Sequence, residues 1–264
     1  MSQLSFILLA LISFLAVILA IYNNNAVVKS YTLKSEKIKG RLRVVLLTDL
    51  HNKKYNPSNI YITDKVAALS PDMIIISGDF VDRMRTDFNI AKQTLDGLRR
   101  IAPVYYAFGN HEKSLGRDNV IQKLDCKDVL LENEYKIFEH YSVLGLSDGI
   151  EKQENRIAVL SVFEKLKNYK ILVVHRPYEF FSGLNIKDRD IDLVLCGHEH
   201  GGLIRIPFFG ALFTHEEGFF PKYSKGAYTE NGTTMVLSGG IGNTMPPFRI
   251  NNFPEIVKID IEEN

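Results

Sequence analysis

The chain is poor in cysteine, in net charge and in low-complexity sequence, and each shortage excludes a class of protein. Cys126 and Cys196 are the only cysteines among 264 residues. A chain of this length buries enough surface to fold without cross-links, so we expect no disulfide framework. Lys and Arg total 32 against 31 Asp and Glu, which leaves no strong basic field for binding a nucleic acid. With 18 Gly and 9 Pro, the composition is neither fibrous nor disordered.

The N-terminal region lacks charge and is apolar from residue 4 to residue 22, apart from Ser5 and Ser13. A helix of this length covers about 28 Å, close to the thickness of the hydrocarbon core of a bilayer. A cleaved signal peptide is the alternative, but such a peptide has a basic start and an apolar run of about 7 to 15 residues. The sequence therefore predicts an uncleaved, single-pass membrane anchor over residues 1–22.

Basic residues follow the apolar run, and we expect them to form a tether over residues 23–40 that leads to one domain of residues 41–264. These cations favour a cytoplasmic domain and can also contact anionic lipid headgroups. Large domains cross membranes with little regard to flanking charge, so the face of the cell membrane on which the domain lies is left open.

Beyond residue 41, short apolar runs alternate with amphipathic stretches, which is the pattern of an α/β domain. Five runs rich in β-branched or aromatic residues have the length of buried strands: 44–47, 73–76, 104–108, 171–174 and 191–195. Apolar residues three or four positions apart predict helices over 58–69, 87–101 and 119–124.

Each predicted strand is followed by side chains that can bind a metal ion. Five of the seven histidines lie at these strand ends, together with Asp and Asn: the group is Asp49, His51, Asp79, Asn110, His111, His175, His198 and His200. Because ligands of α/β sheets bind beyond the carboxyl ends of the strands, we expect these segments to converge on one place.

Oxygen and imidazole donors without cysteine favour a divalent cation such as Mn, Fe or Zn over a structural thiolate zinc site. All of this group except His111 are counted as candidate ligands; these seven are too many for one tetrahedral ion and suit two ions that share a carboxylate. Two such ions can hold a phosphoryl group, activate water near neutral pH and neutralise the leaving oxygen. The donor set therefore suits hydrolysis of a phosphoester.

The motifs, in their order, resemble those of the calcineurin-like metallophosphoesterase superfamily. They are Asp-x-His at 49–51, Gly-Asp-x-x-Asp at 78–82, Gly-Asn-His-Glu at 109–112, the isolated His175 and Gly-His-x-His at 197–200. The resemblance extends from about residue 41 to the C-terminus. It implies a four-layer α/β/β/α sandwich that follows the N-terminal transmembrane helix, and two divalent metal ions, with Mn expected to serve in vitro.

The same resemblance implies a role for each candidate residue. The ligands of one ion would be Asp49, His51 and His200, and those of the other would be Asn110, His175 and His198, with Asp79 bridging the two. His111 would contact the substrate and protonate the leaving oxygen, and Asp82 would orient His111.

The anchor, together with segments 218–223 and 240–244, is similar to the bacterial membrane-associated branch, which hydrolyses phosphodiesters or pyrophosphates, including UDP-diacylglucosamine. We therefore expect a lipid-linked or nucleotide-sugar-lipid substrate. Glu199 stands where relatives usually carry Thr, and Leu203 where many carry Gln; neither position is a ligand in the family pattern.

Several alternatives stay open. The activity could be that of a phosphomonoesterase acting on proteins or small molecules, or the chain could be a membrane-tethered scaffold without turnover, although every ligand position and His111 are filled. Lys222 and Arg249 could hold a second phosphate or could be ordinary solvated cations. A cluster of phenylalanines could line a lipid-facing entrance or pack in the core: Phe208, Phe209, Phe213, Phe219 and Phe220. The native metal pair and the oligomeric state are left open.

Overall fold

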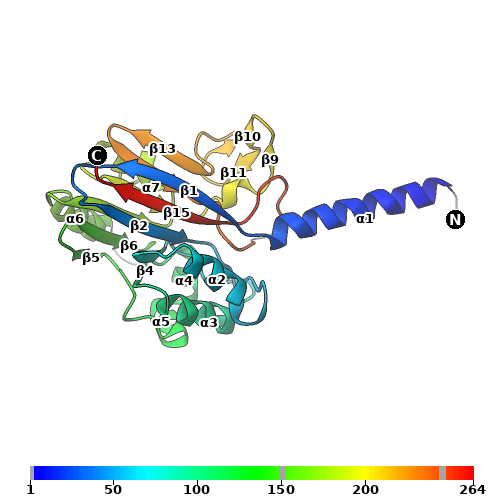
Figure 1. Cartoon of the computed structure of the whole chain (residues 1–264), viewed down its shortest axis with the longest axis horizontal. Coiled ribbons are helices and arrows are strands. Elements are labelled where there is room, and N and C mark those ends of the chain that lie inside the picture. Colours follow the sequence, from blue (N-terminus) through cyan, green and yellow to red (C-terminus); the bar gives the residue numbers. More distant parts are fainter. Residues whose placement is uncertain (1–2, 149–152, 244–247) are drawn as a thin grey trace.

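The computed structural model describes residues 3–148, 153–243 and 248–264. Residues 1 and 2 of the expected anchor, and Thr244 of segment 240–244, lie outside these ranges. Two β-sheets pack face to face with helices on their outer sides, and the N-terminal helix α1 (Gln3–Asn24) projects away from them (Figure 1).

The remaining helices lie within the domain, and three of them were predicted from the sequence. They are α2 (Ile60–Ala68), α3 (Phe88–Arg99), α4 (Asn110–Leu115), α5 (Arg117–Leu124), α6 (Gln153–Phe163) and α7 (Tyr178–Phe181), with three 3₁₀ turns: η1 (Pro57–Asn59), η2 (Ile186–Asp188) and η3 (His200–Gly202). The predicted helices correspond to α2, α3 and α5. Helix α3 begins after Asp87, whose side chain accepts a hydrogen bond from the backbone N–H of Asn89 and so caps the helix.

The first sheet has five strands. Their order is β1 (Val27–Lys34), β15 (Glu255–Glu262), β2 (Arg41–Leu47), β3 (Met73–Ile76) and β4 (Val104–Tyr106). Neighbouring strands are parallel except β15 and β2, which are antiparallel. The predicted strands of this sheet correspond to β2, β3 and β4.

The second sheet has six strands, of which β7 and β8 were predicted. The order is β13 (Gly226–Glu230), β14 (Thr233–Leu237), β8 (Leu193–Cys196), β7 (Tyr169–Val174), β6 (Tyr141–Leu146) and β5 (Glu134–Ile137). The strands from β14 to β6 are parallel, and both edge strands are antiparallel to their neighbours. Two small hairpins lie apart from it: β9 (Arg205–Ile206) with β10 (Gly210–Ala211), and β11 (Phe213–Thr214) with β12 (Gly218–Phe219).

Alternation of apolar side chains along the strands builds three buried clusters. Along β2, Val45 packs with residues of α2, α3 and α5, whereas Val44 packs between the two sheets. Along β7, Ile171 lies between the sheets and Leu172 packs with residues of α6 and α7. Three cores separate four layers. The predicted α/β/β/α sandwich is therefore confirmed.

Residues 27–34 differ from the sequence-based expectation. They form strand β1, whose eight residues pair in parallel register with β15. The prediction of a tether over 23–40 is thus wrong for this segment, because its backbone belongs to the first sheet. The segment lacked a strand signal because it is an edge strand whose side chains are mostly exposed, with only Tyr31 and Leu33 packed against the core.

Helix α1 is long and apolar enough to cross a membrane, and its apolar window has no buried part. A signal sequence near an N-terminus meets the same description. The last turn of α1 is attached to the domain, because the ring centroids of Tyr22 and Phe253 lie 4.4 Å apart and Lys53 Nζ donates a hydrogen bond to the backbone oxygen of Asn23.

Candidate metal centre

Loops that follow five parallel strands meet at the edge between the two sheets. Asp49 and His51 follow β2, Asp79 follows β3, and Asn110 follows β4. From the second sheet, His175 follows β7, and His198 and His200 follow β8. The structure places these side chains in two adjacent groups, together with His111.

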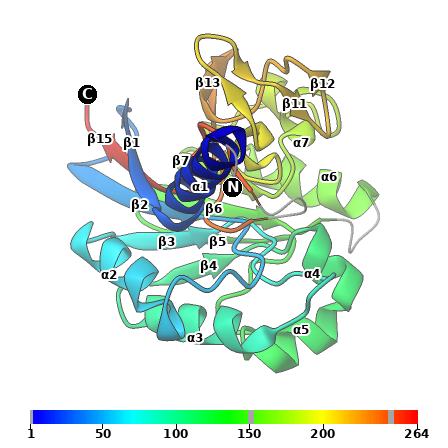
Figure 2. The ribbon, with the colours of Figure 1, turned by 90° about the vertical axis from the view of Figure 1, so that its right-hand side faces the viewer.

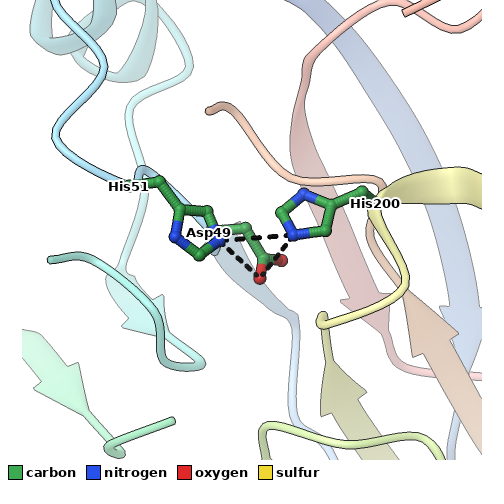
Figure 3. A group of neighbouring side chains, drawn as sticks. All are labelled: Asp49, His51 and His200. Atoms are coloured by element: carbon green, nitrogen blue, oxygen red, sulfur yellow. Dashed lines mark hydrogen bonds and ion pairs between the residues drawn. The ribbon is translucent and has the colours of Figure 1, made fainter. Parts of the chain in front are cut away.

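The first group consists of Asp49, His51 and His200. Figure 3 shows their side chains pointing toward one another. His51 Nε2 lies 3.3 Å from His200 Nε2, and Asp49 Oδ1 lies 3.7 Å from each of these nitrogens. All three residues are buried. One carboxylate oxygen and two ring nitrogens thus face a common point, which is the donor arrangement that a divalent cation needs.

The second group consists of Asp79, His175 and His198, with Asn110 beside them. His175 Nε2 lies 3.1 Å from Asp79 Oδ2 and 3.2 Å from His198 Nδ1. The side-chain oxygen of Asn110 is buried without a hydrogen-bond partner among the described residues, and Asn110 lines the same cavity as Asp79 and His198. Because an unsatisfied buried oxygen is costly, this atom fits the role of a metal ligand.

Asp79 connects the two groups. The same oxygen, Oδ2, lies 3.1 Å from His175 Nε2 in the second group and 3.9 Å from His51 Nε2 in the first. A single carboxylate therefore lies between both sets of donors.

The backbone at the strand ends is sharply turned. Five of the seven candidate ligands have φ angles between 47° and 76°: Asp49, His51, Asp79, His198 and His200. Residues other than glycine seldom adopt this left-handed region, and such strain gathers at functional sites. The turns direct each side chain back toward the sheet edge.

Glycines at two strand ends allow the groups to approach closely. A Cβ atom on Gly78 would lie 2.6 Å from His175 Nδ1, and one on Gly109 would lie 2.3 Å from Asp79 Oδ1. Any larger residue would push the candidate ligands apart. This explains the glycines of the Gly-Asp and Gly-Asn-His motifs.

Electrostatics at the centre favour positive charge. Burial opposes ionisation of Asp49, but the imidazoles of His200 and His51 outweigh it and hold the pKa of Asp49 below its usual range. Burial is likewise outweighed at Asp79, where His175 keeps the pKa well below the usual value. Conversely, Asp79 overcomes burial and raises the pKa of His175 to about 10. Two ionised, buried carboxylates suit bound cations, whose binding displaces protons from histidine ligands.

His111 lies over the centre, but it is not oriented as the sequence led us to expect. Its Nδ1 accepts a hydrogen bond of 3.1 Å from the backbone N–H of Arg83, whereas Asp82 Oδ1 is 3.7 Å away and accepts instead from the backbone of Met84. The predicted orienting role of Asp82 is therefore replaced by the Arg83 amide. Burial lowers the pKa of His111 to about 4, so the ring is neutral near pH 7. Its proton then resides on Nε2, which lies 3.9 Å from Asp79 Oδ2.

Glu112, the last residue of the Gly-Asn-His-Glu motif, is buried and holds two ligand loops together. Its carboxylate accepts hydrogen bonds from the backbone N–H groups of Asp79, Phe80, Val81 and Gly109, at 2.7 to 3.1 Å, and from the hydroxyl of Tyr106 at 2.8 Å. The Glu112 carboxylate therefore connects the loop after β3 to the loop after β4 through its hydrogen bonds.

A polar cavity opens above the two groups. It is lined by Asp79, Arg83, Asn110, His111, Arg176, His198, His200 and His215. Arg83 and Arg176 were not among the residues predicted from the sequence, but their guanidinium groups can bind phosphoryl oxygens. The position of Arg176 directly after His175, at a strand end, is the feature of the sequence that could have indicated its place in this cavity.

Other candidates lie elsewhere. Arg249 is fully buried and donates to the carbonyl oxygens of Gly242 and His200, and Lys222 pairs with Glu230 on the surface. Of the two readings left open for them, a second-phosphate site gains no support from these contacts, and neither does that of a solvated cation for the buried Arg249. Glu199 is buried and its Oε2 accepts a hydrogen bond of 3.1 Å from the His215 backbone. The Glu199 side chain therefore holds the loop between β11 and β12.

Comparison with known proteins agrees with this geometry. The profile described as calcineurin-like phosphoesterase matches residues 42–202. An uncharacterized metallophosphoesterase of Campylobacter jejuni, Cj0846, is 30% identical over 252 residues, which cover 90% of this chain and 65% of the relative, so the chain spans just under two thirds of that protein. The Escherichia coli phosphodiesterase YaeI is 25% identical over 231 residues, covering 83% of this chain and 82% of YaeI. One crystal structure shares the fold with a TM-score of 0.52 at 11% identity, over 76% of this chain and 91% of the other.

Proposed function

The chain belongs to the calcineurin-like phosphoesterase family, and on this premise we propose that it is a membrane-anchored hydrolase of phosphodiester or pyrophosphate bonds in lipid-linked substrates. Members of the family hydrolyse phosphoester bonds at a dinuclear site of divalent metal ions. The observation that carries the proposal is the place of Asp79 Oδ2, 3.1 Å from His175 Nε2 and 3.9 Å from His51 Nε2.

The residues present fit a pair of cations. Asp49, His51 and His200 would hold one ion. Asn110, His175 and His198 would hold the other, with Asp79 shared. When bound, the ions would polarise the phosphoryl oxygens and activate water. Oxygen and imidazole donors without thiolate suit Mn, Fe or Zn, and we propose Mn for activity in vitro.

Three side chains above the centre would act on the substrate directly. Arg83 and Arg176 would bind phosphoryl oxygens that do not react, since guanidinium groups form paired hydrogen bonds with phosphate. His111, whose ring is neutral, would donate a hydrogen bond from its Nε2–H to the leaving oxygen as the phosphorus–oxygen bond breaks, and the proton that this oxygen finally takes up would come from water. Water is the nucleophile in this scheme, so no covalent enzyme intermediate is required.

A cavity at the end of α1 supports the proposal that the substrate lies at the membrane. Asn24, the last residue of α1, lines one cavity together with His51, Lys53, Arg85 and Asp87. Within the described ranges, no carboxylate forms an ion pair with Lys53. Two cations beside the candidate centre, next to the proposed anchor, would suit a second, unreacted phosphate of a lipid-linked substrate.

One assay separates the proposal from its alternatives. The full chain in detergent with Mn²⁺ is compared on bis-p-nitrophenyl phosphate, p-nitrophenyl phosphate and a phosphopeptide, beside Asp79→Asn and His111→Ala. A preference for the diester that both substitutions abolish supports the phosphodiesterase. A preference for a monoester favours a phosphomonoesterase. Equal background in all three proteins indicates a scaffold without turnover.

A further inference from the structure

The two small hairpins between η3 and β13 form a projection of residues 205–220, here called the hairpin lobe. Phenylalanine side chains on this lobe are strongly exposed: Phe208 by 107%, Phe209 by 76%, Phe219 by 72% and Phe220 by 59%. Single exposed apolar residues are ordinary, but four aromatic rings on so short a segment form a patch, and patches of this kind mark interaction sites.

The backbone of the lobe is strained where two of these rings project. Phe208 has a φ angle of 70° and Phe220 one of 51°. Bulky residues rarely occupy this region, and the strain is not offset by burial of either ring. The arrangement therefore presents the rings outward rather than packing them in a core.

The lobe and the end of α1 are attached to the same segment of chain. At the start of β9, the backbone N–H of Arg205 donates a hydrogen bond to the carbonyl oxygen of Ile250. Ile250 also forms an isolated β-bridge with Ile204. Three residues farther along, Phe253 packs against Tyr22 of α1. Figures 1 and 2 show the lobe at the end of the domain from which α1 projects. A bilayer that contains α1 would therefore face the lobe.

An apolar cavity connects the lobe to the candidate metal centre. Leu203, Ile204, Leu212 and Phe213 line it, and so does His200. Its volume is about 170 Å³, and the atoms that line it are mostly apolar. A hydrocarbon chain that leaves the bilayer at the lobe would thus meet an apolar surface that ends at a candidate ligand.

We propose that the hairpin lobe is a second membrane-contacting surface, whose phenylalanines enter the interface of the bilayer that α1 spans and open the cavity beside His200 to lipid acyl chains. Apolar and aromatic side chains bury favourably at this interface. The inference rests on the proposed membrane anchoring by α1.

Tryptophan fluorescence tests the lobe directly, because the chain has no tryptophan of its own. Phe208→Trp and Phe220→Trp each introduce a single reporter into the full chain, which is reconstituted into phosphatidylcholine vesicles with or without brominated acyl chains. We expect brominated lipid to quench both reporters. Phe14→Trp on α1 serves as the reporter of the anchor, and Ile137→Trp, on an exposed position of β5, as the reporter that stays unquenched.

The outcomes separate the lobe from the anchor. Quenching of the α1 reporter without quenching of either lobe reporter overturns the inference and leaves the proposed anchor intact. A blue-shifted lobe reporter that brominated lipid does not quench also overturns it, since protein would then cover the rings. If the α1 reporter is unquenched as well, the anchoring in the proposed function fails together with the inference. None of these readouts depends on metal ions or on activity.

Discussion

Glu216 Oε1 lies 3.4 Å from His198 Nε2, the ring nitrogen opposite the one that faces His175. Arg176 Nη1 is 3.3 Å from the same carboxylate oxygen. Contact with His198 lowers the pKa of Glu216 despite partial burial, and Arg176 adds to this effect. The ionised carboxylate of Glu216 therefore fixes the orientation of the His198 ring through Nε2, which leaves Nδ1 facing the candidate metal centre.

This contact predicts the effect of Glu216→Gln. Carboxylates that orient metal-binding histidines typically change metal affinity by about 10- to 100-fold when they are replaced. We expect a loss of Mn²⁺ affinity in this range with little change in thermal stability, measured by calorimetric titration of the full chain. Glu263→Gln, at an exposed carboxylate near the C-terminus, is the matched control. Unchanged affinity in Glu216→Gln would show that the contact does not support metal binding.

Glu112→Gln should mainly lower stability. The amide cannot accept all the backbone hydrogen bonds that the buried carboxylate receives, and an unsatisfied buried donor costs about 1–3 kcal/mol. We expect Tm to fall by roughly 2–12 °C, since each kcal/mol shifts Tm by about 2–4 °C in a domain of this size. The measurement is a thermal melt beside Glu134→Gln, at an exposed carboxylate on β5. Equal melting of the two variants would contradict the structural role of Glu112.

Asp79→Asn should abolish stabilisation by metal ions. A ligand at 100 times its Kd stabilises the folded state by about 2.7 kcal/mol. Mn²⁺ should therefore raise the Tm of the unaltered chain by roughly 5–11 °C. The variant should show little shift, because both groups of donors lose their shared carboxylate. Chelation by EDTA should reverse the shift in the unaltered chain. An undiminished shift in Asp79→Asn would exclude the shared role.

Asp82→Asn tests which group orients His111. Because the Arg83 amide holds His111 Nδ1, we expect the Asp82 variant to lose less than about tenfold in kcat, whereas His111→Ala should lose about 10²–10⁴-fold. Steady-state hydrolysis of bis-p-nitrophenyl phosphate with Mn²⁺ gives both values. Equal losses in the two variants would restore the orienting role to the Asp82 carboxylate.

Lys53→Met should weaken binding of a substrate with two phosphates. Removal of this ammonium group, which forms no ion pair with a carboxylate of the described residues, should raise KM for a nucleoside diphosphate sugar about tenfold, or about 1.4 kcal/mol, with little effect on kcat. The comparison is Lys54→Met, because the neighbouring lysine is exposed and lines no part of the described cavity. Equal KM values for the two variants would remove the second-phosphate site from the proposal.

Much of the fold was predictable because its central strands are buried on both faces. Such strands are continuous apolar runs, and the run at 73–76 coincides with β3. Strand β1 was not predictable in this way, since an edge strand with exposed side chains carries little apolar pattern. The places of Glu112 and Glu216 were also missed, because each acts on residues that are brought to it by another strand.

The sequence by itself determined which chemical groups stand at each strand end and in what order, and that an apolar helix precedes them, because these properties depend on neighbours along the chain. Tertiary structure decided that Asp79 lies between the two groups of donors and that the amide of Arg83 rather than Asp82 holds His111. It also decided that the hairpin lobe lies at the end of the domain from which α1 projects. The reason is physical: spacing along a chain specifies a turn, but distances between side chains on different strands arise only when the two sheets pack.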